Sequence, residues 1–137
     1  MVIVGDFMEE IWKDIKGYEE LYQVSNLGNV KSVRKKLKPY KREKNSKYLR
    51  VSLTKNKKTK KFYIHRLVAE VFLEFDINSK LQIDHIDNNT YNNNINNLQI
   101  LTQKDNVRKQ MKNMKKNIEK YKQNRIKYII LGSFKND

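Results

Sequence analysis

The chain has 137 residues, with 30 Lys and Arg against 15 Asp and Glu, two histidines, one proline and no cysteine. That length suits one compact domain or a small domain with an appendage, and the lack of cysteine excludes disulfides, thiolate zinc sites and a cysteine nucleophile. No apolar run approaches the roughly 20 residues of a membrane helix and the acidic N-terminus is unlike a signal peptide, so we expect a soluble intracellular protein whose net charge of +15 points to a polyanion.

The positive charge is concentrated in two segments. Residues 31–61 carry a net charge of +14 and residues 103–137 carry +8, whereas residues 1–30 carry −4 and residues 62–102 carry −3. An AT-rich genome favours lysine over arginine, but such a bias would spread lysine evenly along the chain. Basic segments of this kind follow phosphate backbones, which predicts nucleic acid as the partner, ahead of an anionic membrane.

Short β-type runs and turns are predicted in the first half of the chain. Residues 22–25 and 30–33 flank a turn-like stretch at residues 26–29, as expected for two strands joined by a turn. Residues 48–53 and 62–64 predict a hairpin with a lysine-rich tip between them. This tip is either a strip that lies along a phosphate backbone or a solvated loop.

The second half predicts helices around a strand. Residues 65–73 have apolar side chains at helical spacing, which indicates a core helix. Residues 81–86 are strand-like, an asparagine-rich stretch follows to Asn97, and residues 98–101 are again extended.

A second helix is predicted from Thr102, which is a suitable N-cap residue. Residues 126–131 either extend this helix or pack back on the domain. An apolar stripe along the helix is expected to pack in a core, and it consists of Val107, Met111, Met114, Ile118 and Tyr121.

His65 and His85 are the two histidines and the candidates for a near-neutral base. His85 follows Asp84 inside an apolar strand-like run, where a carboxylate is costly to bury unless it is paired or bound to metal. Asp84 and the amide of Asn106 would form a sparse oxygen site that suits Mg²⁺ or Mn²⁺ and is completed by water and phosphate. An ion pair between Asp84 and a lysine, with His85 as a satisfied buried residue, explains the pair equally well.

Two motifs resemble those of a known family. Residues 12–33, WKDIKGYEELYQVSNLGNVKSV, resemble the N-terminal module that precedes many phage and intron-encoded nucleases. The segments YIHRLVAEVFL and IDHIDNNTYNNNINNLQILTQKDN resemble the HNH nuclease motif, so the similarity covers about residues 10–110. The chain is therefore similar to HNH homing-type endonucleases of phage origin.

The resemblance implies an α+β fold in three parts. A small β-rich module at residues 1–60 would bind DNA, a ββα-metal (His-Me finger) nuclease core would occupy residues 61–115, and residues 116–137 would form a basic helical tail. Because residues 107–137 are all that follows the motif, we expect limited sequence specificity or a truncated version.

The resemblance also implies a role for each residue of the motif. Asp84 and Asn106 would be metal ligands, His85 would be the general base that activates water, and Asn97 would hold the loop and orient the histidine. Many relatives have histidine where this chain has Asn106, and this departure favours Mg²⁺ or Mn²⁺, one ion per active site. Neighbours in a regular strand face opposite sides, so Asp84 and His85 can serve one site only if the backbone is distorted or looped there, and we predict such an irregularity.

The implied reaction is metal-assisted hydrolysis of double-stranded DNA, cutting one strand or both, in the cytoplasm of the host cell. For Arg66 an ion pair with Glu70 is as good an explanation as a phosphate contact, and His65 is expected to pack or to cap a helix. We expect nucleic-acid contacts from Lys35, Lys36, Lys55, Lys57, Lys58, Lys60, Lys61, Arg66, Arg108, Lys109 and Lys112.

Two other functions stay open at this stage. One is a DNA-binding protein whose nuclease site has decayed, although the complete set of four motif residues argues against decay. The other is a basic RNA- or ribosome-associated protein, which would leave the Asp-His pair unexplained. Neither a membrane nor a small-molecule cofactor is expected, and the sequence does not decide between a monomer and a homodimer.

Overall fold

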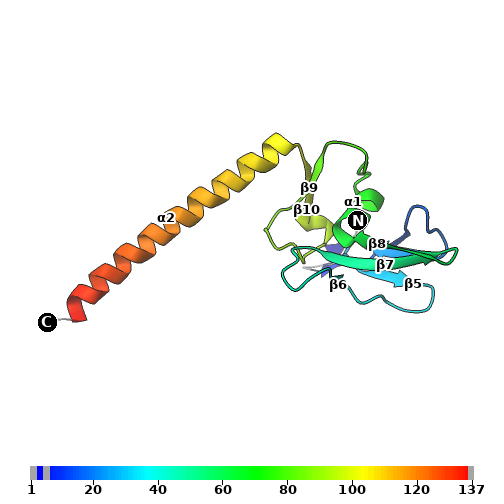
Figure 1. The fold of residues 1–137 in the computed structure, drawn as a ribbon, viewed down its shortest axis with the longest axis horizontal. Helices are drawn as coiled ribbons and strands as arrows, with labels where there is room; N and C mark the ends of the chain where they lie inside the picture. Colours follow the sequence, from blue (N-terminus) through cyan, green and yellow to red (C-terminus); the bar gives the residue numbers. More distant parts are fainter. Residues whose placement is uncertain (1–2, 5–6, 136–137) are drawn as a thin grey trace. The chain divides into compact units, whose positions relative to one another are not determined.

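The computed structural model describes residues 3–4 and 7–135, and it describes the side chains of residues 8–127. The chain forms two compact units, residues 1–100 and residues 101–137 (Figure 1). The strands lie in the first unit, and a long helix forms the second, so the predicted α+β class is confirmed. Across the described ranges, no helix combines the length and the apolar character needed to cross a membrane.

Antiparallel strands open the first unit. The predicted strands at residues 22–25 and 30–33 are confirmed, and the turn between them contains Gly28 at φ +88, a left-handed conformation that glycine adopts without a Cβ penalty. Four further short strands, three here and one in the next sheet, were not predicted, because two or three residues show no alternation. β1 (Ile3–Val4) pairs with β2 (Phe7–Met8), and β3 (Trp12–Asp14), β4 (Tyr22–Ser25) and β5 (Val30–Ser32) form a sheet in that order.

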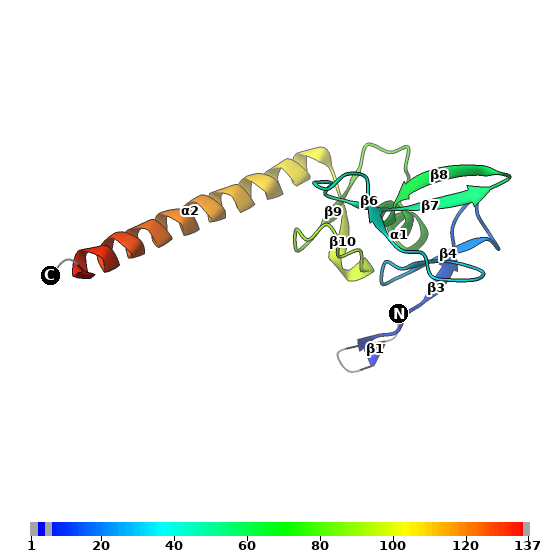
Figure 2. The ribbon, with the colours of Figure 1, turned by 60° about the horizontal axis from the view of Figure 1, so that its bottom comes forward.

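A second three-stranded sheet consists of β6 (Tyr40–Lys41), β7 (Leu49–Lys55) and β8 (Lys58–Tyr63), and Figure 2 shows β7 and β8 side by side. The predicted hairpin is confirmed, but its tip is shorter than predicted because Lys55 pairs with Lys58. Asn56 and Lys57 form the tip with φ 52 and 62. Such two-residue turns match the right-handed twist of the flanking strands.

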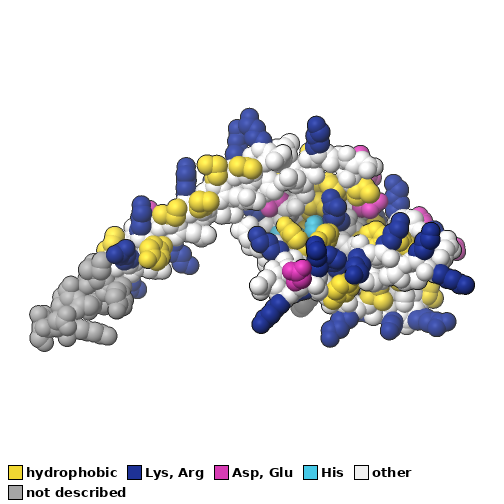
Figure 3. All heavy atoms as spheres, viewed as in Figure 1, with side chains coloured by type: hydrophobic (Ala, Val, Ile, Leu, Met, Phe, Trp, Pro, Cys, Tyr) yellow, Lys and Arg dark blue, Asp and Glu magenta, His cyan; other side chains and the backbone are white. Residues whose placement is uncertain are grey.

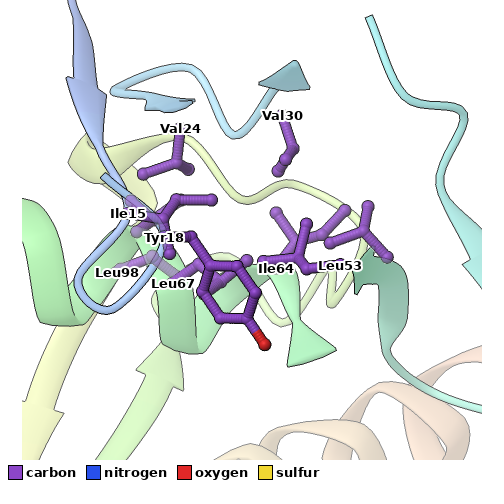
Figure 4. Packing of buried hydrophobic residues seen from close by; sticks show 10 residues of the cluster. Ile15, Tyr18, Val24, Val30, Leu53, Ile64, Leu67 and Leu98 are labelled. Carbon is purple, nitrogen blue, oxygen red and sulfur yellow. The ribbon is translucent and has the colours of Figure 1, made fainter. Parts of the chain in front are cut away.

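The core of the first unit forms around one face of α1 (Ile64–Phe72). This confirms the predicted helix, although Ile64, which we placed in a strand, begins it. Ile64, Leu67 and Val68 are at most 3% exposed. Figure 4 shows the buried cluster that they join, and it also contains Ile15, Tyr18, Val24, Val30, Val51, Leu53 and Leu98.

The two motif regions of the sequence therefore share one core. The predicted boundary between residues 60 and 61 lies inside β8, and the boundary between residues 115 and 116 lies inside the long helix. A shared core does not define the modules of a chain, so the division into three domains stays a prediction.

The remaining strands of the first unit form a two-stranded sheet. β9 (Gln82–His85) pairs with β10 (Leu98–Leu101), and a 3-10 helix, η1 (Ile95–Asn97), precedes β10. Both strands were predicted. The prediction of a distorted backbone between Asp84 and His85 is wrong, since both residues belong to β9. The chain turns just after them instead, where the N–H of Asn88 donates to the carbonyl of His85 (3.0 Å) and Asn88 has φ 64.

The second unit contains α2 (Gln103–Lys135). The predicted N-cap is confirmed, because the N–H of Asp105 donates to Thr102 Oγ1 at 3.1 Å. Residues 126–131 extend the helix, and side chains from residue 128 on lie outside the described residues. The predicted core packing of the apolar stripe from Val107 to Tyr121 is wrong, since its members are 48% to 67% exposed. A single helix has no second layer that would cover such a stripe.

Candidate active site

Asp84 and His85 are the last two residues of β9. Ile83 packs against the core, and His85, two residues on, lies on the same buried face with 4% of its surface exposed. Asp84 lies on the opposite face and is half-buried, as the alternation of a regular strand requires. The carboxylate and the imidazole therefore leave the strand end in opposite directions.

Polar and aromatic contacts hold the ring of His85. Its Nε2 lies 2.8 Å from Oδ1 of Asn93, which is itself 4% exposed. The Tyr48 ring stacks on it at 6.0 Å between centroids, and the His65 ring meets it edge-on at 5.3 Å. We did not single out Asn93 from the sequence, because nothing distinguishes it from the other asparagines between residues 88 and 97.

The carboxylate of Asp84 is oriented from the neighbouring strand. Nε2 of Gln99, on β10, donates to Asp84 Oδ2 at 2.7 Å. Among the described residues there is no group of three His, Cys, Asp or Glu side chains that could hold a metal ion. A single half-exposed carboxylate nevertheless suits a hard ion such as Mg²⁺, which keeps several waters and is commonly held by one or two carboxylates and a substrate phosphate.

Asn97 fixes the loop that connects β9 to η1. Its Nδ2 donates to Asp87 Oδ1 (2.8 Å) and to the carbonyl of Asn92 (2.9 Å), and its Oδ1 accepts from the N–H of Asp87 (3.0 Å). Its own carbonyl accepts from the N–H of Ile86 (2.8 Å). These bonds give Asn97 the loop-holding part of the predicted role, and its catalytic part stays a prediction.

The Asp87 carboxylate is the acceptor around which this loop closes. The N–H of Asn89 donates to it and is the largest cause that lowers its pKa, followed by the amides of Asn97 and Asn92. Asp87 therefore stays charged at neutral pH and keeps its acceptors available to the loop. The sequence indicated only that the segment is a loop, since Asn and Asp favour turns.

His65 packs, as predicted. It is the second residue of α1, 8% exposed, and its ring lies 4.8 Å from that of Tyr48 and 5.6 Å from that of Tyr63. Burial above all, with the nearby His85 and Arg66, lowers the pKa of His65 to about 3. His65 is therefore neutral near pH 7 and adds no positive charge beside His85.

The predicted basic residues are distributed over both units. Lys35 and Lys36 line a cavity of about 430 Å³ beside β5, and the hairpin lysines are exposed, although Lys55 Nζ also donates to the carbonyl of Gly17 at 2.8 Å. Arg66 is exposed, and no ion pair joins it to Glu70 in the described part of the chain. Figure 3 shows Lys and Arg side chains around the histidine atoms on one face of the first unit.

Asn106 lies in the first turn of α2, where its N–H donates to the carbonyl of Thr102 at 3.0 Å. It belongs to the second unit, as do Arg108, Lys109 and Lys112, whereas Asp84 belongs to the first. The pairing of Asp84 with Asn106 as metal ligands therefore stays a prediction.

Comparisons with known proteins match both motif regions of the chain. Residues 10–64 match the NUMOD4 motif and residues 62–108 match the HNH endonuclease model. The chain is 45% identical to the DNA endonuclease I-HmuI of Bacillus phage SP01 over 113 residues. This aligned stretch covers 82% of this chain and 64% of that protein. It is 47% identical over 60 residues to an uncharacterised HNH endonuclease of Acanthamoeba polyphaga mimivirus, which covers 44% of this chain and 18% of that protein.

A solved structure is also similar. It concerns DNA binding and cleavage by the HNH homing endonuclease I-HmuI, and it matches with a TM-score of 0.67 and 47% identity over 77% of this chain and 59% of that chain. In both comparisons this chain spans less than two thirds of the length of I-HmuI.

The bonds of Asn97 predict its contribution to stability. Asn97→Ala removes a side-chain amide that is 7% exposed and makes three hydrogen bonds within the loop, and it is expected to lower the free energy of unfolding by about 2–3 kcal/mol. Asn96→Ala removes an exposed side chain of the same type from the preceding position, and its effect on the free energy of unfolding should stay within about 0.5 kcal/mol. Urea unfolding followed by circular dichroism measures both, and equal effects would contradict the loop-holding role.

Burial of neutral His65 predicts a pH dependence of stability. Because its pKa is 6.5 ordinarily and about 3 in the folded chain, the unfolded chain binds an extra proton between these values, and stability falls as the pH drops through this window. Between pH 7 and pH 5 the loss due to His65 should reach about 2 kcal/mol. His65→Phe should remove that part of the dependence in urea unfolding, and parallel pH curves for the two proteins would contradict it.

Proposed function

We propose that the chain is a member of the HNH homing-type endonucleases, with a NUMOD4 motif ahead of its HNH motif, and that it is a divalent-metal-dependent DNA endonuclease. The observation that carries the proposal is the end of β9, where a half-exposed carboxylate and an oriented imidazole come from consecutive residues. The similar structure of I-HmuI, described as binding and cleaving DNA, supports it.

In the proposed reaction, His85 takes a proton from a water molecule, and the resulting hydroxide attacks the phosphorus in line with the leaving oxygen. Asp84, together with Asn106 from α2, would hold one Mg²⁺ or Mn²⁺ ion. Such an ion, when bound, stabilises the negative charge on the leaving oxygen. Asp84 and His85 are the last residues of β9 and the chain turns directly after them, so we propose that the scissile phosphate lies at this end of the strand, within reach of both side chains.

Double-stranded DNA is the proposed partner, and the cytoplasm of the host cell is the proposed location. The exposed lysines of the β7–β8 hairpin would contact phosphates, since they stand on a rigid sheet and carry no ion pair in the part of the chain that the structure describes. Phosphate contacts position a protein on DNA without reading its sequence.

Cleavage of supercoiled plasmid tests the proposed activity. The protein should nick the plasmid with Mg²⁺ or Mn²⁺ and not with EDTA, and His85→Ala should abolish nicking while DNA binding persists. Asn106→Ala should need a higher Mg²⁺ concentration for half-maximal nicking, because it removes a proposed ligand.

Two results would overturn this function. Tight DNA binding without cleavage in any of these metals would identify a DNA-binding protein with a decayed nuclease site. Preferential binding of RNA over the plasmid would identify a protein of the RNA-binding class instead.

The hairpin contact predicts a salt effect. Lys57 lies at the tip with a positive φ, so Lys57→Asn removes its charge while keeping a residue that tolerates this conformation. The slope of log K for DNA binding against log salt should then become shallower by about one phosphate contact. Lys80→Gln, an exposed lysine in the acidic segment, should leave the slope unchanged. Equal slopes for all three proteins would remove the hairpin from the DNA interface.

A further inference from the structure

The turn between β4 and β5 contacts the loop that leads to η1, although more than sixty residues separate them in the sequence. The carbonyl of Asn26 accepts from the N–H of Ile95 at 2.8 Å. Gly28 lies so close to Asn93 that a Cβ placed on it would be 2.8 Å from Asn93 Cβ and 2.9 Å from the Asn93 carbonyl oxygen. Asn93 therefore takes its position only because residue 28 has no side chain.

Asn93 in turn contacts the imidazole of His85. An amide oxygen has lone pairs and no proton, so it can only accept. With Asn93 Oδ1 at 2.8 Å, Nε2 of a neutral His85 must carry the proton, and Nδ1 is then the unprotonated nitrogen of the ring. Both residues are 4% exposed, so water competes little for this bond.

We propose that Gly28 and Asn93 are positioning residues for the catalytic base. In this chain of contacts the NUMOD4 region sets the place of Asn93, and Asn93 fixes both the orientation of His85 and the nitrogen that receives the proton. The N-terminal region thus takes part in assembling the active site as well as in binding DNA. The catalytic consequence rests on the proposed nuclease function, whereas the tautomer of His85 does not.

Nuclear magnetic resonance of the ¹⁵N-labelled protein at alkaline pH tests the Asn93 contact without any activity. The chain has two histidines, so the spectrum of His85→Ala assigns both rings. In the unmodified protein, Nε2 of His85 should be protonated and Nδ1 should not. Asn93→Ala should give a mixture of tautomers, and Asn93→Asp, whose carboxylate also accepts from Nε2, should restore a single one. A protonated Nδ1 in the unmodified protein, or His85 ring signals that are the same in Asn93→Ala as in the unmodified protein, would overturn the assignment.

Nicking kinetics test the catalytic consequence. Asn93→Ala should lower kcat about 10- to 100-fold at unchanged KM, because the base is misplaced while the DNA contacts persist. Asn93→Asp should recover part of this loss, and Asn96→Ala, an exposed neighbour, should stay within about twofold of the unmodified protein. If no variant nicks and the unmodified protein does not nick either, the nuclease function fails, and the tautomer result decides the contact separately.

Two glycines with the same backbone conformation separate the contact from backbone strain. Gly17 has φ +86 and Gly28 has φ +88, but a Cβ on Gly17 meets nothing within 4 Å. Both alanine variants pay the strain of a positive φ, and only Gly28→Ala displaces Asn93. Gly28→Ala should therefore mix the His85 tautomers and lower kcat about tenfold or more, whereas Gly17→Ala should do neither.

A double variant shows whether Gly28 acts through Asn93. Gly28→Ala combined with Asn93→Ala should reduce kcat by less than the product of the two single effects, since residues in one contact chain are not additive. Should Gly28→Ala fail to fold, the Asn93 series and its spectra still decide the proposal. Independent, multiplicative effects would assign Gly28 a purely structural role.

Discussion

The buried face of α1 is the constraint on which the first unit depends. Ile64, Leu67 and Val68 contact strands that come before the helix and a strand that comes after it, so one short helix joins both motif regions. With 38% hydrophobic and 33% charged residues, the chain has few apolar residues from which separate cores could form. A single shared core is the arrangement that such a composition supports, because small separate domains bury too little apolar surface to be stable.

Hydrogen bonds fix the part of the first unit that the hydrophobic core does not hold. The loop after β9 has almost no apolar side chains, so packing alone cannot fix its conformation. Asn97 and the Asp87 carboxylate hold it from within, the carbonyl of Asn26 holds its far end, and Thr90 and Tyr91 donate to the carbonyls of Lys47 and Ser46. An asparagine can donate and accept at once, which explains why this residue type serves a loop whose ends lie in a strand and a 3-10 helix.

The sequence predicted those elements whose pattern is local. The helix at residues 65–73, the strands around residues 22–33 and the N-cap at Thr102 depend on spacing and side-chain type within a few residues. Prediction failed where the burial or the contacts of a residue depend on residues far away in the sequence. The apolar stripe of α2 has the spacing of a core helix yet stays exposed, and Asn93 differs from neighbouring asparagines only through contacts with Gly28 and His85. The family resemblance implied a role for His85, but it could not indicate that Asn93 contacts this ring.

The β7–β8 hairpin is connected to His85 through regular structure, without an intervening loop. β8 ends at Tyr63, which is the N-cap of α1, and the second residue of that helix is His65, whose ring meets His85. In the proposed nuclease, the lysines of β7 and β8 that would bind phosphates and the proposed base, His85, thus belong to the same unit. Because β8 runs directly into α1 and the His65 ring contacts the His85 ring, the fold of this unit would set the distance along the DNA between the phosphates bound by the hairpin and the phosphate that is cleaved. Replacing the hairpin lysines would then weaken DNA binding alone. Weaker packing of the core around α1 would reduce both DNA binding and the rate of cleavage.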